Sequence, residues 1–191
     1  MSSLIVGYGT LLLSASVGTT IGSSAASEKT YRPVLVPGHR RLFNLRPTHY
    51  DSSSKLSTKG NENAAMNVEP AAECRFNAVV FEVQDNELEA LDQRERYYER
   101  VEVPLLDFST REDLGTGYCY MSRPDAEWIE RDPAKLMPLW RDVVWARTGS
   151  LRLSEAFGAE YDATTYMADG KTLVQETYGR FYDDMSDVEL P

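Results

Sequence analysis

The chain has 191 residues, of which 42% are hydrophobic and 26% charged, as is ordinary for a globular domain with a core of its own. Its formal net charge of −10 argues against a nucleic-acid binder and against a protein that docks on anionic membranes. Cys74 and Cys119 lie in neither CxxC nor His-rich spacing, so they predict no zinc site and no disulfide framework. We expect two free thiols and a cytoplasmic location.

Residues 1–27 carry no charged side chain, which is a feature of some targeting segments. No positive residue precedes the apolar run, and glycine, serine and threonine interrupt the stretch after it, so we expect neither a signal peptide nor a membrane helix. The interpretation is one domain over residues 1–182 and an acidic C-terminal tail at 183–191 that frays.

The first predicted strand is the apolar run 4–6, which Gly7-Tyr8-Gly9 follows directly. Glycine permits backbone angles and close approaches that a Cβ atom forbids, so this triplet predicts a sharp exit from the strand. Such a loop directs successive N–H groups outward, where they can hold a carboxylate or a developing oxyanion. Alone, the pattern favours a plain turn without a ligand. A Rossmann nucleotide site is rejected because the third glycine is missing.

Residues 14–30 are small and polar and fit either a weak helix or an ordered loop. Strands are expected at 31–36 and 41–45, joined into a hairpin by a turn at Pro37-Gly38. Arg40 and Arg41 are interpreted as exposed charges on the second of these strands. His39 and His49 are expected in a turn or on the surface.

Residues 50–63 are polar without a period and predict a surface loop. Further strands are expected at 64–68 and 76–83, and the second is the stronger because its apolar run is continuous. Asn86 as N-cap and Glu89 at the capping-box position then predict a short helix that ends near residue 94.

Strands at 97–105 and 118–121 come after this helix. Asp132-Pro133 predicts the start of a helix that Gly149 closes, and Ser154 is the expected N-cap of one more. Because strands fill the first two-thirds without βαβ alternation, the predicted class is α+β. We expect a small, strongly curved, mostly antiparallel sheet or barrel with a few short helices.

A carboxylate on the short helix is the main candidate for chemistry. Leu88, Leu91 and Glu95 lie at i, i+3 and i+7, which is the helical face expected to meet the core. Burial there would raise the pKa of Glu95 toward neutrality, as a general acid or base requires. If the helix ends earlier, Glu95 reaches solvent or pairs with an arginine such as Arg94, and spacing alone favours this plainer alternative.

Four segments occur in order over residues 3–121: Tyr-Gly-Thr-Leu at 8–11, Gly-His-Arg-Arg-Leu-Phe-Asn at 38–44, Phe-Asn-Ala-Val-Val-Phe-Glu-Val at 76–83, and Leu-Asp-Gln-Arg-Glu at 91–95. Together they resemble the gamma-glutamylcyclotransferase family, including its AIG2-like and gamma-glutamylamine cyclotransferase members. The segments correspond to the family's Tyr-Gly-Ser/Thr-Asn/Leu loop, Gly-x-x-Arg-x-Phe-Asn strand, central strand and Leu-Asp-x-x-Glu segment. The chain departs from the pattern at Asn77-Ala78, where the family usually carries a glycine, and at Thr10-Leu11.

The resemblance implies intramolecular aminolysis of a small γ-glutamyl amino acid or amine, which yields 5-oxoproline and the free amine. It implies Glu95 as the general acid/base and no metal or other cofactor. The backbone N–H groups of four residues would hold the α-carboxylate or the oxyanion: Tyr8, Gly9, Thr10 and Leu11. Tyr97 and Tyr98 are expected to cover the site.

A second function remains open, namely a binding module that keeps the pocket for a γ-glutamyl or amino-acid-like ligand without turnover. On either hypothesis the expected partner is a small molecule rather than a nucleic acid or a membrane. The sequence assigns neither the specific substrate nor the oligomeric state.

Overall fold

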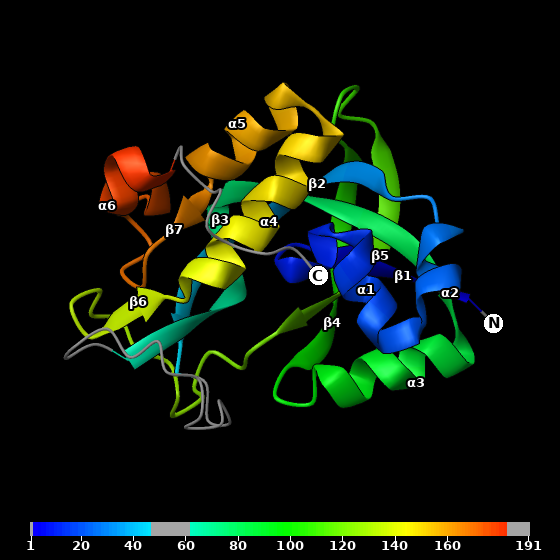
Figure 1. Ribbon diagram of the computed structural model, residues 1–191, viewed down its shortest axis with the longest axis horizontal. Helices are drawn as coiled ribbons and strands as arrows, with labels where there is room; N and C mark the ends of the chain where they lie inside the picture. Colours follow the sequence, from blue (N-terminus) through cyan, green and yellow to red (C-terminus); the bar gives the residue numbers. More distant parts are fainter. Residues whose placement is uncertain (1, 47–61, 183–191) are drawn as a thin grey trace.

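The computed structural model describes residues 2–46 and 62–182, which have an α+β fold (Figure 1). The strands are β1 (Ser2–Gly7), β2 (Arg32–Leu45), β3 (Glu62–Gln84), β4 (Glu99–Asp107), β5 (Asp113–Met121), β6 (Leu136–Pro138) and β7 (Thr165–Tyr166). The α-helices are α1 (Ser14–Ile21), α2 (Ser23–Ser27), α3 (Asp85–Arg94), α4 (Trp140–Leu153), α5 (Glu155–Ala163) and α6 (Val174–Tyr178). Short 3₁₀ turns form η1 (Thr10–Leu12) and η2 (Gly179–Tyr182). The predicted tail at 183–191 and most of the predicted loop at 50–63 lie outside the described residues.

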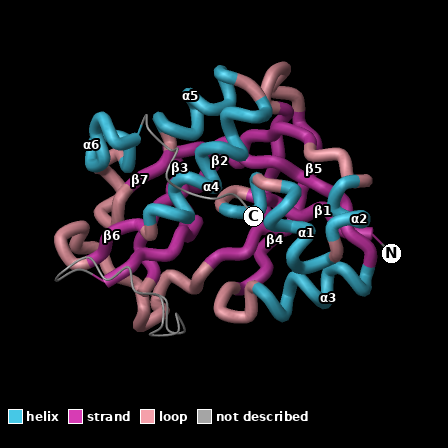
Figure 2. Tube along the Cα trace, viewed as in Figure 1, coloured by secondary structure: helices cyan, strands magenta, loops and turns pink. Residues whose placement is uncertain are grey.

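Five of the seven strands pair in a closed ring. β3 pairs with β1, β1 with β5, β5 with β4, β4 with β2, and β2 again with β3. Only the β1–β5 pairing in this ring is parallel. The predicted class, a strongly curved and mostly antiparallel sheet or barrel, is therefore confirmed. The helices lie outside the strands, with α4 and α5 together on one side and α1 to α3 grouped on another (Figure 2).

The hairpin predicted over residues 31–45 is wrong, because the two expected strands are one strand, β2. Pro37-Gly38 is not a turn, because β2 continues through it and pairs with β3 on both sides. The register shifts between Pro37 and His39, and Gly38 has φ of 73°, so these residues form a bulge within one long strand. The predicted strands at 64–68 and 76–83 are likewise two parts of β3, since pairing with β2 extends from Val80 to Ala65.

The helices near β1 differ in part from those predicted, in the segment 14–30 and at the start of α3. Of residues 14–30, for which a weak helix or an ordered loop was expected, 14–21 and 23–27 form α1 and α2, and the last three residues are not helical. Helix α3 begins two residues earlier than predicted. Its N-cap is Gln84, and Glu87 completes the capping box in place of the predicted pair Asn86 and Glu89.

Helix α4 begins later than predicted, at Trp140 rather than after Asp132-Pro133. Gly149 does not close it but lies inside it, where a Cβ atom would come within 2.9 Å of the Leu12 Cβ atom. This glycine lets α4 approach η1, so the helix supports the loop that follows β1. The predicted cap of α5 is confirmed, because the Ser154 side chain accepts a hydrogen bond from the Phe157 N–H.

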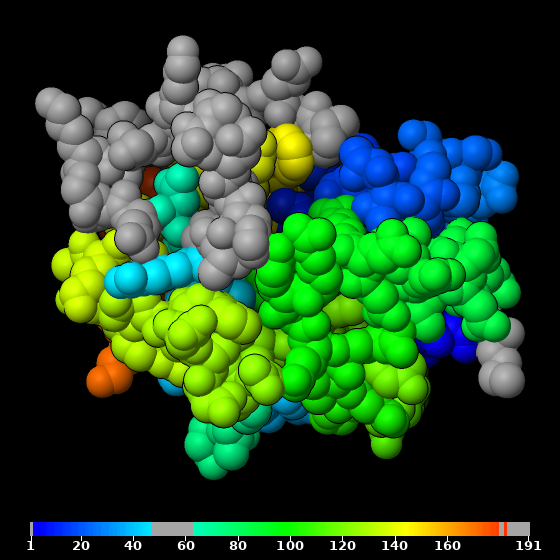
Figure 3. All heavy atoms as spheres, turned by 90° about the horizontal axis from the view of Figure 1, so that it is seen from below, coloured from blue at the N-terminus to red at the C-terminus, as the bar shows by residue number. Residues whose placement is uncertain are grey.

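The described surface brings together segments that are far apart in sequence. Figure 3 shows α3 and the chain that follows it (green) between the N-terminal helices (blue) and residues 122–135 (yellow-green). Both cysteines are free thiols, as predicted, with Cys119 buried and Cys74 half-buried. Within the described ranges, no helix combines the length and apolar character that a bilayer crossing demands.

Candidate active site

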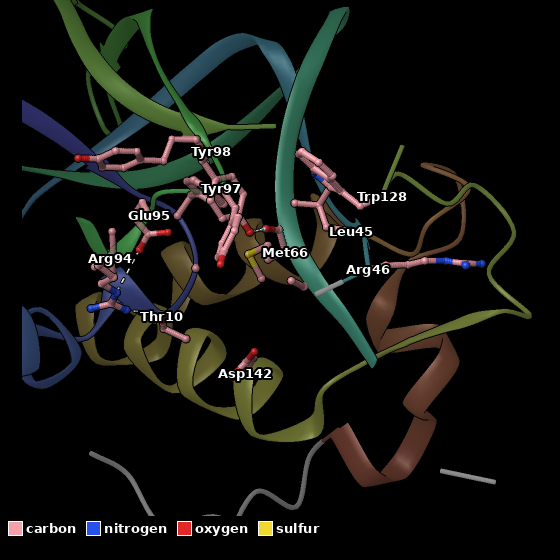
Figure 4. Close-up of a pocket in the computed structure, with 15 residues that line it drawn as sticks. Thr10, Leu45, Arg46, Met66, Arg94, Glu95, Tyr97, Tyr98, Trp128 and Asp142 are labelled. Carbon is pink, nitrogen blue, oxygen red and sulfur yellow. Dashed lines mark hydrogen bonds and ion pairs between the residues drawn. The ribbon is translucent and has the colours of Figure 1, made fainter. Parts of the chain in front are cut away.

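A cavity of about 330 Å³ lies between the loop after β1, the end of α3 and the start of α4 (Figure 4). The five residues predicted for the site all line it: Tyr8, Gly9, Thr10, Leu11 and Glu95. They come from two segments that are more than eighty residues apart in the sequence. The other lining residues are Leu45, Arg46, Ala65, Met66, Arg94, Tyr97, Tyr98, Tyr120, Trp128 and Asp142.

The loop after β1 turns sharply at Gly7. A Cβ atom on Gly7 would lie 2.8 Å from the Leu11 carbonyl oxygen, so only glycine allows the chain to fold back this closely. The Leu12 N–H donates to the Gly9 carbonyl at 3.0 Å, which is the first hydrogen bond of η1. The N–H groups of Gly9, Thr10 and Leu11 therefore precede the hydrogen-bonded turn, and no acceptor among the described residues engages them.

Glu95 lies just beyond α3 rather than on its core face. It is the C-cap residue, and its N–H donates to the Leu91 carbonyl at 2.8 Å. The helix thus ends before Glu95, and the carboxylate pairs with Arg94, as the plainer alternative described. Its side chain is nevertheless only 18% exposed and lines the cavity. Burial raises the pKa of Glu95 above its ordinary value of 4.5, although the Arg94 guanidinium acts in the opposite direction.

Arg94 connects the carboxylate to the loop and to α1. Its Nε lies 3.1 Å from Glu95 Oε1, while its Nη2 donates to the Thr10 hydroxyl at 3.1 Å. The other end of the guanidinium donates to the Ser16 carbonyl at 2.7 Å and to the Thr20 hydroxyl at 2.9 Å. One side chain therefore holds the loop, α1 and the candidate acid in a common arrangement.

Arg41 is not the exposed strand charge that we predicted, because its side chain is fully buried. It donates to the Tyr8 carbonyl at 3.4 Å, to the Asn77 carbonyl at 2.7 Å and to the Thr165 hydroxyl at 3.0 Å. The guanidinium also lies 4.0 Å from the centre of the Tyr161 ring. Burial lowers the pKa of Arg41 to about 10, which still leaves it cationic at neutral pH.

Asn77, where the chain departs from the family pattern, has a structural role. Its side-chain oxygen accepts from Arg41 at 3.0 Å, and its side-chain nitrogen donates to the Phe157 carbonyl at 2.7 Å. The residue thereby joins β3 to α5 and helps to hold the cation behind the loop. Arg40, the neighbouring strand arginine, instead pairs with Glu69 at 2.6 Å and is 28% exposed.

The aromatic residues after α3 form part of the wall. The Tyr98 hydroxyl donates to the Met66 carbonyl at 2.8 Å, while Tyr97 is 39% exposed at the cavity. Tyr8 contributes mainly its backbone, because its ring is buried and its hydroxyl donates to the Tyr120 carbonyl at 2.7 Å. His39 is half-buried, with its ring beside the Pro37 carbonyl oxygen, and it does not line the cavity.

Sequence reasoning did not identify Asp142 or Trp128 as lining residues. Asp142 comes from the first turn of α4, and Figure 4 shows its carboxylate directed toward the cavity, opposite Glu95. Trp128 comes from an irregular segment between β5 and β6. No local motif marks either position, since only the packing of α4 and this segment against the loop brings them to the cavity. Across residues 2–46 and 62–182, no group of histidine, cysteine and acidic residues is arranged to hold a metal ion.

Comparison with known proteins supports the fold. No protein-family model matches the chain, and no curated protein matches it significantly. A solved structure of a gamma-glutamyl cyclotransferase superposes with a TM-score of 0.64 at 13% identity, over 86% of this chain and 88% of that one. An uncharacterized human protein gives a TM-score of 0.63 at 14% identity, over 85% and 88% of the two chains.

A third neighbour, YkqA from Bacillus subtilis, gives a TM-score of 0.57 at 12% identity and covers 83% of this chain and 52% of its own. At these identities the likeness concerns the fold. The chain has a gamma-glutamylcyclotransferase-like fold, and the resemblance predicted from the four sequence segments is confirmed at that level.

Proposed function

We propose that the protein is a cyclotransferase that converts a γ-glutamyl amino acid or amine to 5-oxoproline and the free amine, with Glu95 as the general acid/base. The observation that carries this proposal is that Glu95 lines the same cavity as Gly9, Thr10 and Leu11, whose N–H groups have no acceptor among the described residues. A proton carrier and a set of anion-binding donors are the two elements that such a reaction needs.

In the proposed reaction, the substrate's α-ammonium first loses a proton to Glu95. The freed α-amine attacks its own γ-carbonyl carbon, so that a ring C–N bond forms as the carbonyl oxygen gains negative charge. The negative charge on oxygen then re-forms the C=O bond, and Glu95 returns its proton to the leaving nitrogen as the original amide C–N bond breaks. The surplus proton on the ring nitrogen passes to the released amine, which leaves as an ammonium ion. A carboxyl group whose pKa is raised by burial suits both transfers near neutral pH.

The loop and its supports would position the substrate rather than take part in bond making. The N–H groups of Gly9, Thr10 and Leu11 suit the α-carboxylate or the oxyanion. Because ring closure is unimolecular once the substrate is bound, correct orientation supplies much of the acceleration. The reaction as written involves no metal or nucleotide.

The ion pair between Glu95 and Arg94 favours one alternative, a binding module without turnover. A carboxylate held at 3.1 Å by a guanidinium is stabilised in its ionised form, which weakens it as a base. In that alternative the same pocket would bind a γ-glutamyl or amino-acid-like ligand, and Glu95 would contact the ligand's ammonium group.

The test is 5-oxoproline release from γ-glutamyl amino acids, γ-glutamyl amines and glutathione by wild type and Glu95→Gln. Glutamine keeps the shape of the side chain and removes the proton carrier, so turnover is expected to fall by at least about a hundredfold. Glu99→Gln is the matched control, because Glu99 lies four residues later and its side chain is 59% exposed. Activity that survives in Glu95→Gln would remove Glu95 as the acid/base. Ligand-induced thermal stabilisation without turnover would favour the binding module.

A further inference from the structure

One wall of the cavity, on the side away from Glu95, is apolar. Figure 4 places Leu45 and Trp128 on the opposite side of Met66 and Tyr97 from Glu95. Leu45 is 4% exposed and Met66 is 9% exposed, so both are well packed where they line the cavity. We call Leu45, Met66 and Trp128 the apolar subsite.

The polar groups around the apolar subsite have partners outside the cavity. The Trp128 indole N–H donates to the Ser122 hydroxyl at 3.0 Å, which leaves the ring as the surface that a ligand meets. The Arg46 guanidinium pairs with Glu130 at 2.8 Å and points away from the cavity in Figure 4. The surface formed by Leu45, Met66 and Trp128 is therefore apolar and offers little to a charged substituent, while the Asp142 carboxylate enters the cavity separately, from α4.

Backbone contacts hold this wall in place before any ligand arrives. The Arg46 N–H donates to the Trp128 carbonyl at 2.9 Å, and Leu45 forms an isolated β-bridge with Ile129. Trp128 is thus attached to the end of β2 through its backbone and to Ser122 through its ring. A rigid wall of this kind binds an apolar group without first having to become ordered.

The direction of the substrate depends on the proposed function, on which this inference rests. With the α-carboxylate on the loop, and the α-amine and the leaving nitrogen both within reach of Glu95, the substituent on the leaving nitrogen extends away from the loop and Glu95, toward the apolar subsite. We infer that the protein selects γ-glutamyl compounds whose leaving amine carries an apolar, preferably aromatic, substituent. Stacking and dispersion on Trp128 and Met66 would supply the preference.

The first test compares substrates on the wild-type protein in two pairs that differ only in size and apolar area. One pair is γ-glutamylphenethylamine and γ-glutamylethylamine, and the other is γ-glutamylphenylalanine and γ-glutamylalanine. We expect kcat/KM to be at least about tenfold higher for the aromatic member of each pair. Equal or lower values for the aromatic members would overturn the inference and leave the proposed function standing. No turnover of any member would instead overturn the proposed function.

The second test assigns the preference to the wall. Trp128→Ala is expected to bring the ratio of the aromatic to the small substrate close to one. Ser122→Ala is the matched control, because it removes the partner of the indole N–H and keeps the ring, and it is expected to retain the preference. A ratio that is unchanged in a folded Trp128→Ala variant would overturn the assignment. Should that variant fail to fold, the wild-type ratios still decide the inference.

Discussion

Arg94 and Glu95 are neighbours in sequence whose side chains meet, with 3.1 Å between Arg94 Nε and Glu95 Oε1. Burial and the neighbouring Arg94 guanidinium shift the pKa of Glu95 in opposite directions. Removal from water favours the protonated carboxyl, whereas the adjacent cation favours the ionised one, and burial is the larger effect. The net result is a pKa of Glu95 above its ordinary value, and Arg94 determines how far above.

This balance predicts a pH effect for Arg94→Gln. Glu95 must be ionised to accept a proton, so the proposed activity falls on the acid side of its pKa. Loss of the guanidinium raises the pKa of Glu95 further, and the acidic limb of the kcat/KM profile is expected to move to higher pH. Arg96→Gln is the control, because Arg96 lies over the Tyr97 ring and makes no pair with Glu95. An unmoved limb would show that Arg94 does not influence the acid/base group.

Glu95 is also expected to cost stability at neutral pH. Because its pKa is raised in the folded state, the folded protein binds the extra proton, and stability is lost as pH rises from about 4.5 through the folded value. Glu95→Gln removes this loss. Its melting temperature should exceed that of wild type at pH 7 to 8, and the difference should vanish below the ordinary carboxyl range. Thermal melts across pH measure both, and a variant less stable than wild type at pH 8 contradicts the expectation.

Arg41→Gln is expected to destabilise the fold strongly. The change leaves buried carbonyl and hydroxyl acceptors without a donor, including those of Tyr8 and Thr165, at a cost of about 3 kcal/mol or more. Arg40→Gln on the same strand is expected to cost less than about 1 kcal/mol, since Glu69 keeps its partner Arg131 at 2.6 Å. Denaturant unfolding of the two variants gives the comparison. Equal losses would mean that Arg41 is not the cation that holds the loop from behind.

Substitution of Gly7, the last residue of β1, should cost more stability than substitution of Gly9 in the loop that follows. Gly7→Ala places a Cβ atom 2.8 Å from the Leu11 carbonyl oxygen, which is backbone and moves only with the loop, at a cost of about 1–3 kcal/mol. Gly9→Ala meets only the Met66 sulfur at 3.2 Å, a flexible side chain, and should cost less than about 1 kcal/mol. Chemical denaturation of each variant measures this order. The reverse order would show that the loop does not depend on Gly7 for its path.

Much of the candidate site could be predicted from local patterns. The apolar run before Gly7, the glycines around Tyr8 and the serine cap of α5 act within a few residues, so their structures do not depend on distant partners. Two alternatives were open for Glu95: a buried carboxylate on the core face of the helix, or, as spacing alone favoured, a residue beyond the helix end that reaches solvent or pairs with Arg94. The structure has the second, with the Glu95 side chain 18% exposed. The helix ends at Arg94, and Glu95 reaches the cavity as its C-cap residue rather than from its core face.

By itself, then, the sequence determined the class of the fold, the glycine loop, the short helix that precedes Glu95 and the likeness to a known family. Only the tertiary structure decided whether Pro37-Gly38 is a turn or a bulge, because that depends on β3 pairing with both halves of β2. It likewise decided that Arg41 is buried, since its acceptors come from β3, the β1 loop and the region of α5 and β7. Asp142 and Trp128 reach the cavity through the same long-range packing, which no local pattern encodes.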